Sequence, residues 1–259
     1  MKKLVLKQIR RGIILGLTIS VPLSTFLYAK ITFPTNPTGP AKIFYHLIDE
    51  FVGSELERRL QEEFNVDYEG VLNDQVILNL YHDFNYFKNK NEQLLEHLKK
   101  IVIIPNYIYE SELVYPYWNY LAKANSNGSI EMSEDYERRT LTHELAHIKA
   151  FHLSAEQKQE FKNYFDWTEK PERNKQGYYG WNDGSDKPKN GFVRAYGALN
   201  VDECLATYVE LFYNNSENYY FWKTVDKQNF DYTKPLSFLL REGFILQEHY
   251  DNAIKAMNK

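Results

Sequence analysis

Cysteine is almost absent from this chain, since Cys204 is the one cysteine among 259 residues. A single cysteine cannot form an intrachain disulfide, and it excludes a zinc site built from four cysteines. Such a chain must rest on its hydrophobic core, for which its length is sufficient. A lone cysteine in a helix is more often a packing residue than a nucleophile, so we expect Cys204 to pack.

A surplus of positive charge is also missing, with 31 Lys and Arg residues against 35 Asp and Glu residues. Five of the basic residues lie within residues 1–29, which contain no acidic residue. The rest of the chain therefore has 26 basic and 35 acidic residues, a formal net charge of −9. This acidic body argues against nucleic acid or an anionic membrane surface as a partner.

Residues 1–29 have the pattern of a targeting segment, with clustered Lys and Arg before an uncharged, mostly apolar stretch from Gly12 to Ala29. The pattern favours a Sec-type signal cleaved after Ala29, although Leu27 stands where a small residue is preferred. The stretch is also long enough to cross a bilayer, so an uncleaved signal anchor is the alternative. Either interpretation predicts a chain that is secreted or otherwise extracytoplasmic, with the membrane contacted only through such an anchor.

After a proline-rich linker over residues 30–40, residues 41–259 are predicted to form one α+β domain with a mainly helical C-terminal half. Periodicity predicts helices over 41–64, 92–99, 133–151, 154–167, 202–213, 217–227 and 236–257, and strands over 75–81, 101–104 and 129–133. Asn127-Gly128 predicts a turn before the strand over 129–133. That strand is either an edge strand that can pair with an extended peptide or an ordinary hairpin strand. A long loop over 168–193 holds an aromatic cluster at 178–181, which either lines a cleft or packs on the core.

The pattern H-E-x-x-H occupies residues 143–147 and carries the chemistry. On a helix, His143 and His147 lie one turn apart on the same face, where they can bind one zinc ion together. Glu144 beside the first histidine can then act as a general base. Leu141, Leu145 and Ile148 form the apolar stripe of this helix, about 200° away from the histidines. Core histidines would be expected on the stripe, so this orientation favours a site.

A catalytic zinc ion needs a third protein ligand and one open position. Glu203 is the favoured candidate, because a carboxylate on a second helix can complete a His₂Glu site and Ala206 one turn later allows close helix packing. Asp202 and Glu210 are the rivals, and Asp202 could instead orient a ligand histidine. His152 lies at the wrong spacing and on a different face.

The segment over residues 191–206 resembles the second half of the lethal-factor-type zinc peptidase domain, a group that includes the secreted Pro-Pro endopeptidases. The shared features are Tyr196-Gly197, Asn200, and a helix beginning around the E-x-x-A that starts at Glu203, with seven residues from Tyr196 to Glu203. The chain departs from a broader set of similar gluzincins, in which Asp and Glu stand at the positions of Cys204 and Thr207. The resemblance covers about residues 101–213.

This resemblance implies a zincin-like metallopeptidase fold with a small mixed sheet, an active-site H-E-x-x-H helix and one Zn²⁺ ion held by His143, His147 and Glu203. Glu144 would take a proton from a zinc-bound water as it attacks a peptide carbonyl, and would pass it to the leaving amine. Tyr196 would hydrogen-bond the developing oxyanion.

The sequence therefore predicts an exported, monomeric zinc peptidase that acts on a peptide or protein substrate. One alternative is an extracellular sensory or binding module that holds zinc without significant turnover. Another is a scaffold protein in which H-E-x-x-H arose by coincidence. Glu144 and Tyr196 favour the enzyme, because a purely structural zinc site needs neither.

Overall fold

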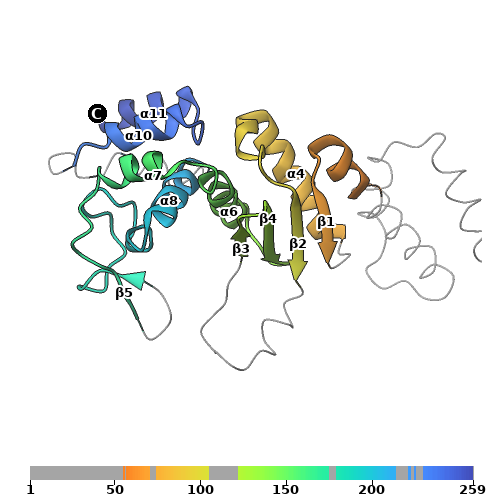
Figure 1. Ribbon diagram of the computed structural model, residues 1–259, viewed down its shortest axis with the longest axis horizontal. Coiled ribbons are helices and arrows are strands. Elements are labelled where there is room, and N and C mark those ends of the chain that lie inside the picture. The colour runs from red at the N-terminus through yellow and green to blue at the C-terminus, as the bar shows by residue number, and fades with distance from the viewer. Residues whose placement is uncertain are drawn as a thin grey trace, which may run out of the picture.

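The computed structural model describes residues 55, 57–70, 74–104, 122–174, 179–213, 221–222, 225 and 230–258. The targeting segment and the linker expected over residues 1–40 lie outside these ranges. Within them the protein combines a small mixed sheet with helices, which confirms the predicted α+β class. Figure 1 shows the sheet on one side and a helical C-terminal half on the other, with helix α6 (Arg138–Ala150) between them.

The main sheet has four strands in the order β1-β2-β4-β3. Strands β1 (Asp67–Gly70), β2 (Lys100–Ile104) and β4 (Ser129–Ser133) are parallel, whereas β3 (Ala122–Asn125) runs antiparallel to β4. The strands predicted at 101–104 and 129–133 are therefore present. Of the two alternatives for 129–133, the structure has the hairpin strand and not the edge strand. β3 pairs with β4 and forms the outer strand of the sheet in the described part of the chain.

The tight connection from β3 to β4 depends on the predicted Asn127-Gly128 turn. Gly128 has φ +88°, a backbone conformation that L side chains rarely adopt, and its amide donates to the carbonyl of Asn125 at 3.0 Å. A Cβ atom at this position would lie 2.6 Å from the carbonyl oxygen of His97. Glycine is therefore required both by the turn and by the close approach of a neighbouring loop.

The strand predicted over residues 75–81 is wrong, because these residues belong to the helix α4 (Asp74–Asn91). The consecutive apolar side chains of Val76 and Ile77 look strand-like in a short window. Over a longer window Leu80, Phe84 and Phe87 continue the same stripe at helical spacing, and all five side chains are buried. The continuous apolar face of α4 thus determines the structure of residues 75–81, in spite of their local β propensity. The short helix expected over 92–99 is one 3₁₀ turn, η1 (Glu92–Leu94).

The helix α6 begins later than predicted. The predicted helix starts at Ser133, but this serine ends β4, and its Oγ accepts from the amide of Asp135 at 3.1 Å. Glu137 stands at the N-cap position in an extended conformation. Every residue from Leu141 to Ala150 is buried, because the sheet and the helix α8 (Val201–Tyr213) cover different sides of α6.

The helical half follows the predicted order with some differences at the helix ends. The helix α7 (Ala155–Lys162) starts at the Ser154 capping box but stops before residue 167. The helix expected over 236–257 is two helices, α10 (Thr233–Arg241) and α11 (Gln247–Met257). Gly243, at φ +72°, separates them. The helix expected over 217–227 lies mostly outside the described residues.

The long loop predicted over 168–193 contains a short hairpin of β5 (Glu172–Arg173) and β6 (Tyr179–Gly180), followed by the 3₁₀ turn η2 (Ala195–Ala198). In its aromatic cluster, Trp181 packs on the core, since it is buried and lies near Phe192. The ring of Tyr179 lies 5.7 Å from that of Tyr196, and Tyr178 lies outside the described residues. Among the helices of the described residues, none combines the length and apolar character needed to cross a membrane.

The close packing of α6 against α8 leads to a stability prediction. Ala206 is fully buried on the face of α8 that also carries Glu203 and Glu210. We expect Ala206→Leu to overpack this contact and lower the free energy of unfolding by about 1–3 kcal/mol. Denaturant unfolding would measure the change. Ala155→Leu, at an exposed position of α7, is the control and should change stability by less than about 0.5 kcal/mol. Equal effects of the two variants would contradict the prediction.

Candidate metal centre

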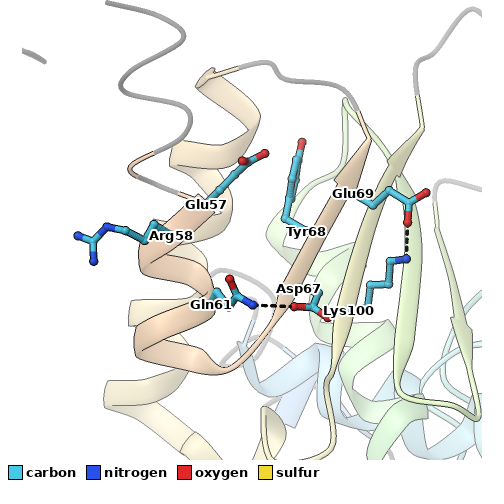
Figure 2. A pocket seen from close by; sticks show the side chains of 7 residues that line it. All are labelled: Glu57, Arg58, Gln61, Asp67, Tyr68, Glu69 and Lys100. Atoms are coloured by element: carbon cyan, nitrogen blue, oxygen red, sulfur yellow. Dashed lines mark hydrogen bonds and ion pairs between the residues drawn. The ribbon is translucent and has the colours of Figure 1, made fainter. Parts of the chain in front are cut away.

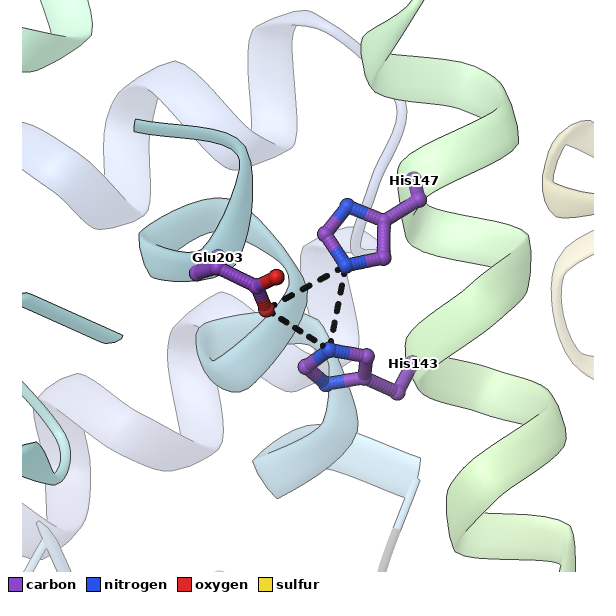
Figure 3. Close-up of side chains that lie close together, drawn as sticks. All are labelled: His143, His147 and Glu203. Carbon is purple, nitrogen blue, oxygen red and sulfur yellow. Dashed lines mark hydrogen bonds and ion pairs between the residues drawn. The ribbon is translucent and has the colours of Figure 1, made fainter. Parts of the chain in front are cut away.

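Three side chains converge between α6 and α8 (Figure 3). Nε2 of His143 lies 3.0 Å from Oε2 of Glu203, and Nε2 of His147 lies 3.3 Å from the same oxygen. The two Nε2 atoms are 3.1 Å apart. Within the part of the chain that the structure describes, this is the one group of three or more His, Cys, Asp or Glu side chains whose ligand atoms could hold a metal ion.

Local helix geometry explains how each ligand is placed. His143 and His147 are one turn apart on α6, so their rings project from the same face. Glu203 lies in the first turn of α8, where its amide donates to Oδ1 of Asn200 at 2.9 Å. This hydrogen bond caps the helix and fixes the point at which its carboxylate meets the histidines.

The protonation of these side chains reflects their burial and their mutual contacts. Burial alone would lower the pKa of His143, but hydrogen bonds with Glu203 and Glu210 outweigh it and raise the pKa to about 9. Burial would raise the pKa of Glu203, yet hydrogen bonds with His143 and His147 lower it to about 2. Without a metal, the charge of the carboxylates is therefore balanced by a proton on the imidazoles, which a cation could replace.

Glu210 was a rival for the third ligand position, but it contacts His143 from the side away from the cluster. One of its carboxylate oxygens, Oε2, lies 3.0 Å from Nδ1 of His143, whereas the Nε2 atom of that ring faces Glu203. A carboxylate at Nδ1 fixes the tautomer with the proton on Nδ1 and leaves the Nε2 lone pair for a metal. Glu210 therefore contacts the imidazole of a candidate ligand from outside the cluster, the position that the sequence had suggested for Asp202.

The other candidates lie elsewhere. Asp202 forms an ion pair with Lys158 at 2.7 Å. The exposed ring of His152 stacks on His97, with centroids 3.7 Å apart, outside the cluster. Cys204 is fully buried and burial raises its thiol pKa, which agrees with the predicted packing role.

Glu144 lies beside the ligands, on the side of α6 that faces the sheet edge. Its Oε2 atom accepts a hydrogen bond of 2.6 Å from the amide of Ala124 in β3. Burial raises the pKa of Glu144, while the nearby imidazoles and the Ala124 amide act in the opposite direction. A buried carboxylate with a raised pKa is a better base than one in water.

Tyr196 reaches the cluster from η2. Its ring centroid lies 5.9 Å from that of His143. Burial, the charge of Glu203 and a hydrogen bond with that carboxylate all raise the pKa of the phenol. Tyr196 thus stays protonated near neutral pH and has an O–H group to donate.

A separate hollow of about 540 Å³ lies at the other edge of the sheet, beside β1 (Figure 2). Its polar groups pair with one another, Gln61 with Asp67 at 3.2 Å and Lys100 with Glu69. It shares no residue with the cluster of His143, His147 and Glu203. This hollow therefore adds nothing to the candidate metal centre.

Sequence reasoning missed the contact of Ala124 with Glu144 and the pairing of Glu210 with Arg139 and Arg194. One signal for Glu210 was available, because a position seven residues after Glu203 lies on the same helix face. The sequence of the partner strand β3, A-K-A-N, has little β propensity, so the Asn127-Gly128 turn was the signal for it.

The comparisons with known proteins add one likeness. No family model matches the chain, and no curated protein matches its sequence. Among solved structures, the chain is similar to a protein from Bacteroides caccae ATCC 43185 described as a "putative zinc-binding metallo-peptidase". The identity is 13% and the TM-score 0.47, with 81% of this chain and 92% of that chain covered. The chemistry of the centre therefore rests on the side-chain geometry described above.

Proposed function

We propose that this protein is an exported zinc-dependent peptidase. The observation that carries the proposal is the convergence of two Nε2 atoms and one carboxylate oxygen within 3.0–3.3 Å of one another, with Glu144 beside them. A site for binding alone would need no base next to the ligands. The buried Glu144 and the protonated Tyr196 therefore favour turnover over a sensory or binding module.

The donor set fits zinc. Two imidazole nitrogens and one carboxylate oxygen are three of the four ligands of a tetrahedral site, which leaves one position open. The carboxylate of Glu210 at Nδ1 of His143 is the outer partner that a ligand histidine usually has. A zinc ion held by these three residues would polarise a peptide carbonyl and make water more acidic.

Glu144 is the proposed general base. Its carboxylate is buried, and the hydrogen bond from the Ala124 amide holds it at the sheet edge. From that position it would accept a proton from the attacking water and deliver it to the leaving amine. The raised pKa of Glu144 favours the second step as well, since the protonated carboxyl must exist long enough to act as an acid.

Tyr196 and β3 are the proposed substrate-facing groups. The phenol O–H of Tyr196 would donate to the oxyanion that forms at the attacked carbonyl. Because Ala124 directs its amide toward Glu144 and away from β4, the outer edge of β3 faces the site. An extended peptide that pairs with this edge would bring its backbone to Glu144. The proposed export rests on the targeting pattern of residues 1–29.

Zinc binding is the first test of this function. We expect the purified protein to bind one zinc ion, and zinc at about 100 times its Kd should stabilise the fold by about 2.7 kcal/mol. Glu203→Ala should weaken binding by more than about 100-fold, beyond the range typical of outer-sphere substitutions. Asp202→Asn, on the same helix turn, is the matched control and should bind zinc as the wild type does. Competition titration with a chelator would measure both, and equal affinities would contradict the assignment of Glu203.

The pH dependence of zinc binding follows from the raised pKa of His143. Metal binding needs the neutral imidazole, but the metal-free protein keeps this ring protonated up to about pH 9. Zinc affinity should therefore rise with pH up to about 9, and binding at pH 7 should release about one proton. Calorimetry in buffers of different ionisation enthalpy would count the protons. Glu210→Gln, which removes one hydrogen-bonding carboxylate from the ring, should reduce this release, and no release from the wild type would count against the prediction.

A substitution at Glu144 tests catalysis independently of metal binding. We expect Glu144→Gln to reduce peptide hydrolysis by at least about 10²-fold, because a general base contributes about 10²–10⁴-fold. Zinc affinity should change little, since Glu144 is outside the ligand group. Cleavage of a peptide library, followed by mass spectrometry, would measure the activity. The control Glu160→Gln removes a carboxylate on α7 that pairs with Arg241, and it should retain full hydrolysis. Wild-type hydrolysis by Glu144→Gln would refute the mechanism.

A further inference from the structure

The buried carboxylate of Glu210 has more cationic partners than a ligand-orienting group needs. Besides His143, it contacts Arg139 of α6 through Oε1 and Arg194 through Oε2, the latter at 2.5 Å. Its side chain is only 6% exposed. One hydrogen bond would suffice to orient the imidazole. The two guanidinium groups therefore need a further explanation.

Charge balance accounts for the presence of both arginines, but it does not explain why Arg194 comes from the segment that carries Tyr196. A buried carboxylate is costly unless cations compensate it, and both arginines do so here. Arg139 precedes His143 by four residues, so α6 itself brings it to Glu210. Arg194, in contrast, comes from the extended residue directly before η2, in the same short segment as Tyr196.

The guanidinium of Arg194 makes a second contact that links it to Tyr196. Its Cζ atom lies 5.7 Å from the centroid of the Tyr196 ring, within the range of a cation–π interaction. The backbone around it is held as well, because the amide of Ala195 donates to Asp186 at 2.7 Å and that of Gly197 donates to the carbonyl of Arg194 at 3.1 Å. The arginine is therefore fixed between a carboxylate and an aromatic ring.

These contacts close a circuit of five side chains around the candidate metal centre. His143 contacts Glu203, Glu203 interacts with the phenol of Tyr196, and Tyr196 packs against Arg194. Arg194 binds Glu210, and Glu210 returns to Nδ1 of His143. A displacement of any one of these side chains would therefore change its contacts with both neighbouring members.

We propose that Arg194 is a positioning residue that couples the placement of Tyr196 to the orientation of the ligand His143 through Glu210. The effect of Arg194 on catalysis rests on the proposed peptidase function. The coupling between Arg194 and Tyr196 can be measured by zinc affinity alone. The planar guanidinium matters because it can bind a carboxylate and stack on a ring at the same time, which a lysine ammonium does less well.

A double-mutant cycle on zinc affinity tests this coupling without any need for catalysis. The variants are Arg194→Met, Tyr196→Leu and the pair of them, each titrated with zinc against a chelator. Leucine is chosen because it removes the aromatic ring that Arg194 contacts. Residues in contact should show non-additive effects, whereas independent residues add. We expect the zinc affinity of the double variant to differ from the product of the single effects by about threefold or more.

Arg139 provides the matched control, because Arg139→Met removes a cation from the same carboxylate and leaves the Arg194–Tyr196 contact in place. Its effect on zinc affinity should be similar in size to that of Arg194→Met, about 10-fold, as for other outer-sphere changes. In combination with Tyr196→Leu it should be additive. Additive behaviour of Arg194→Met with Tyr196→Leu would overturn the proposal and leave Arg194 as charge compensation alone.

Arg194→Lys is a second variant that keeps the protein folded if Arg194→Met does not. It keeps the charge beside Glu210, so we expect near wild-type zinc affinity and an unchanged melting temperature, but weaker coupling to Tyr196. In peptide hydrolysis, Arg194→Lys should lower kcat by several-fold with little change in KM. If the wild type binds zinc and cuts no peptide, the proposed peptidase function fails, while the zinc cycle still decides the coupling. Full coupling retained by Arg194→Lys would show that the charge alone suffices and would overturn the role of the planar group.

Discussion

The contact between α6 and α8 is the constraint on which the rest of this protein depends. Arg139, His143 and His147 follow one another at intervals of four residues on α6, and Glu203 and Glu210 face them from α8. Charged groups buried in this way are stable only with partners of opposite charge, and removing one partner costs far more than the pair contributes. The same interdigitation that satisfies the buried charges also brings three ligand atoms together.

The sheet supports the contact between α6 and α8, because it packs against the other side of α6. β4 leads directly into the turn before α6, and β3 lies against the helix with its outward amide on Glu144. The proposed base and the two histidines thus lie on one helix between two supports, and Glu203 faces them from α8. Proposed catalytic groups held on rigid elements keep their geometry more precisely than groups held on loops. Tyr196 is the exception, since it belongs to the 3₁₀ turn η2, where its ring contacts Arg194 and the amide of the preceding residue donates to Asp186.

Sequence patterns predicted the parts of the fold where a periodic segment is long or where a turn signal is clear. The strand at 101–104, the turn at Asn127-Gly128 and the helix from residue 202 to residue 213 are present as expected. The error at residues 75–81 arose because a short apolar run fits both a strand and a helix. β3 was missed because its residues carry little β propensity of their own, although a tight turn joins it directly to β4.

The candidate centre shows the same division. Local spacing within one helix determined that His143 and His147 share a face and that Glu144 projects beside them, because a helix repeats every 3.6 residues whatever surrounds it. Spacing could not distinguish Glu203 from Asp202 and Glu210, since all three are carboxylates in the same helix. Their roles depend on the angle at which α8 crosses α6: Glu203 meets the ligand nitrogens, Glu210 meets the far side of His143, and Asp202 turns to Lys158. Such distinctions arise from packing between segments some sixty residues apart by count along the chain, which a periodicity of a few residues cannot encode.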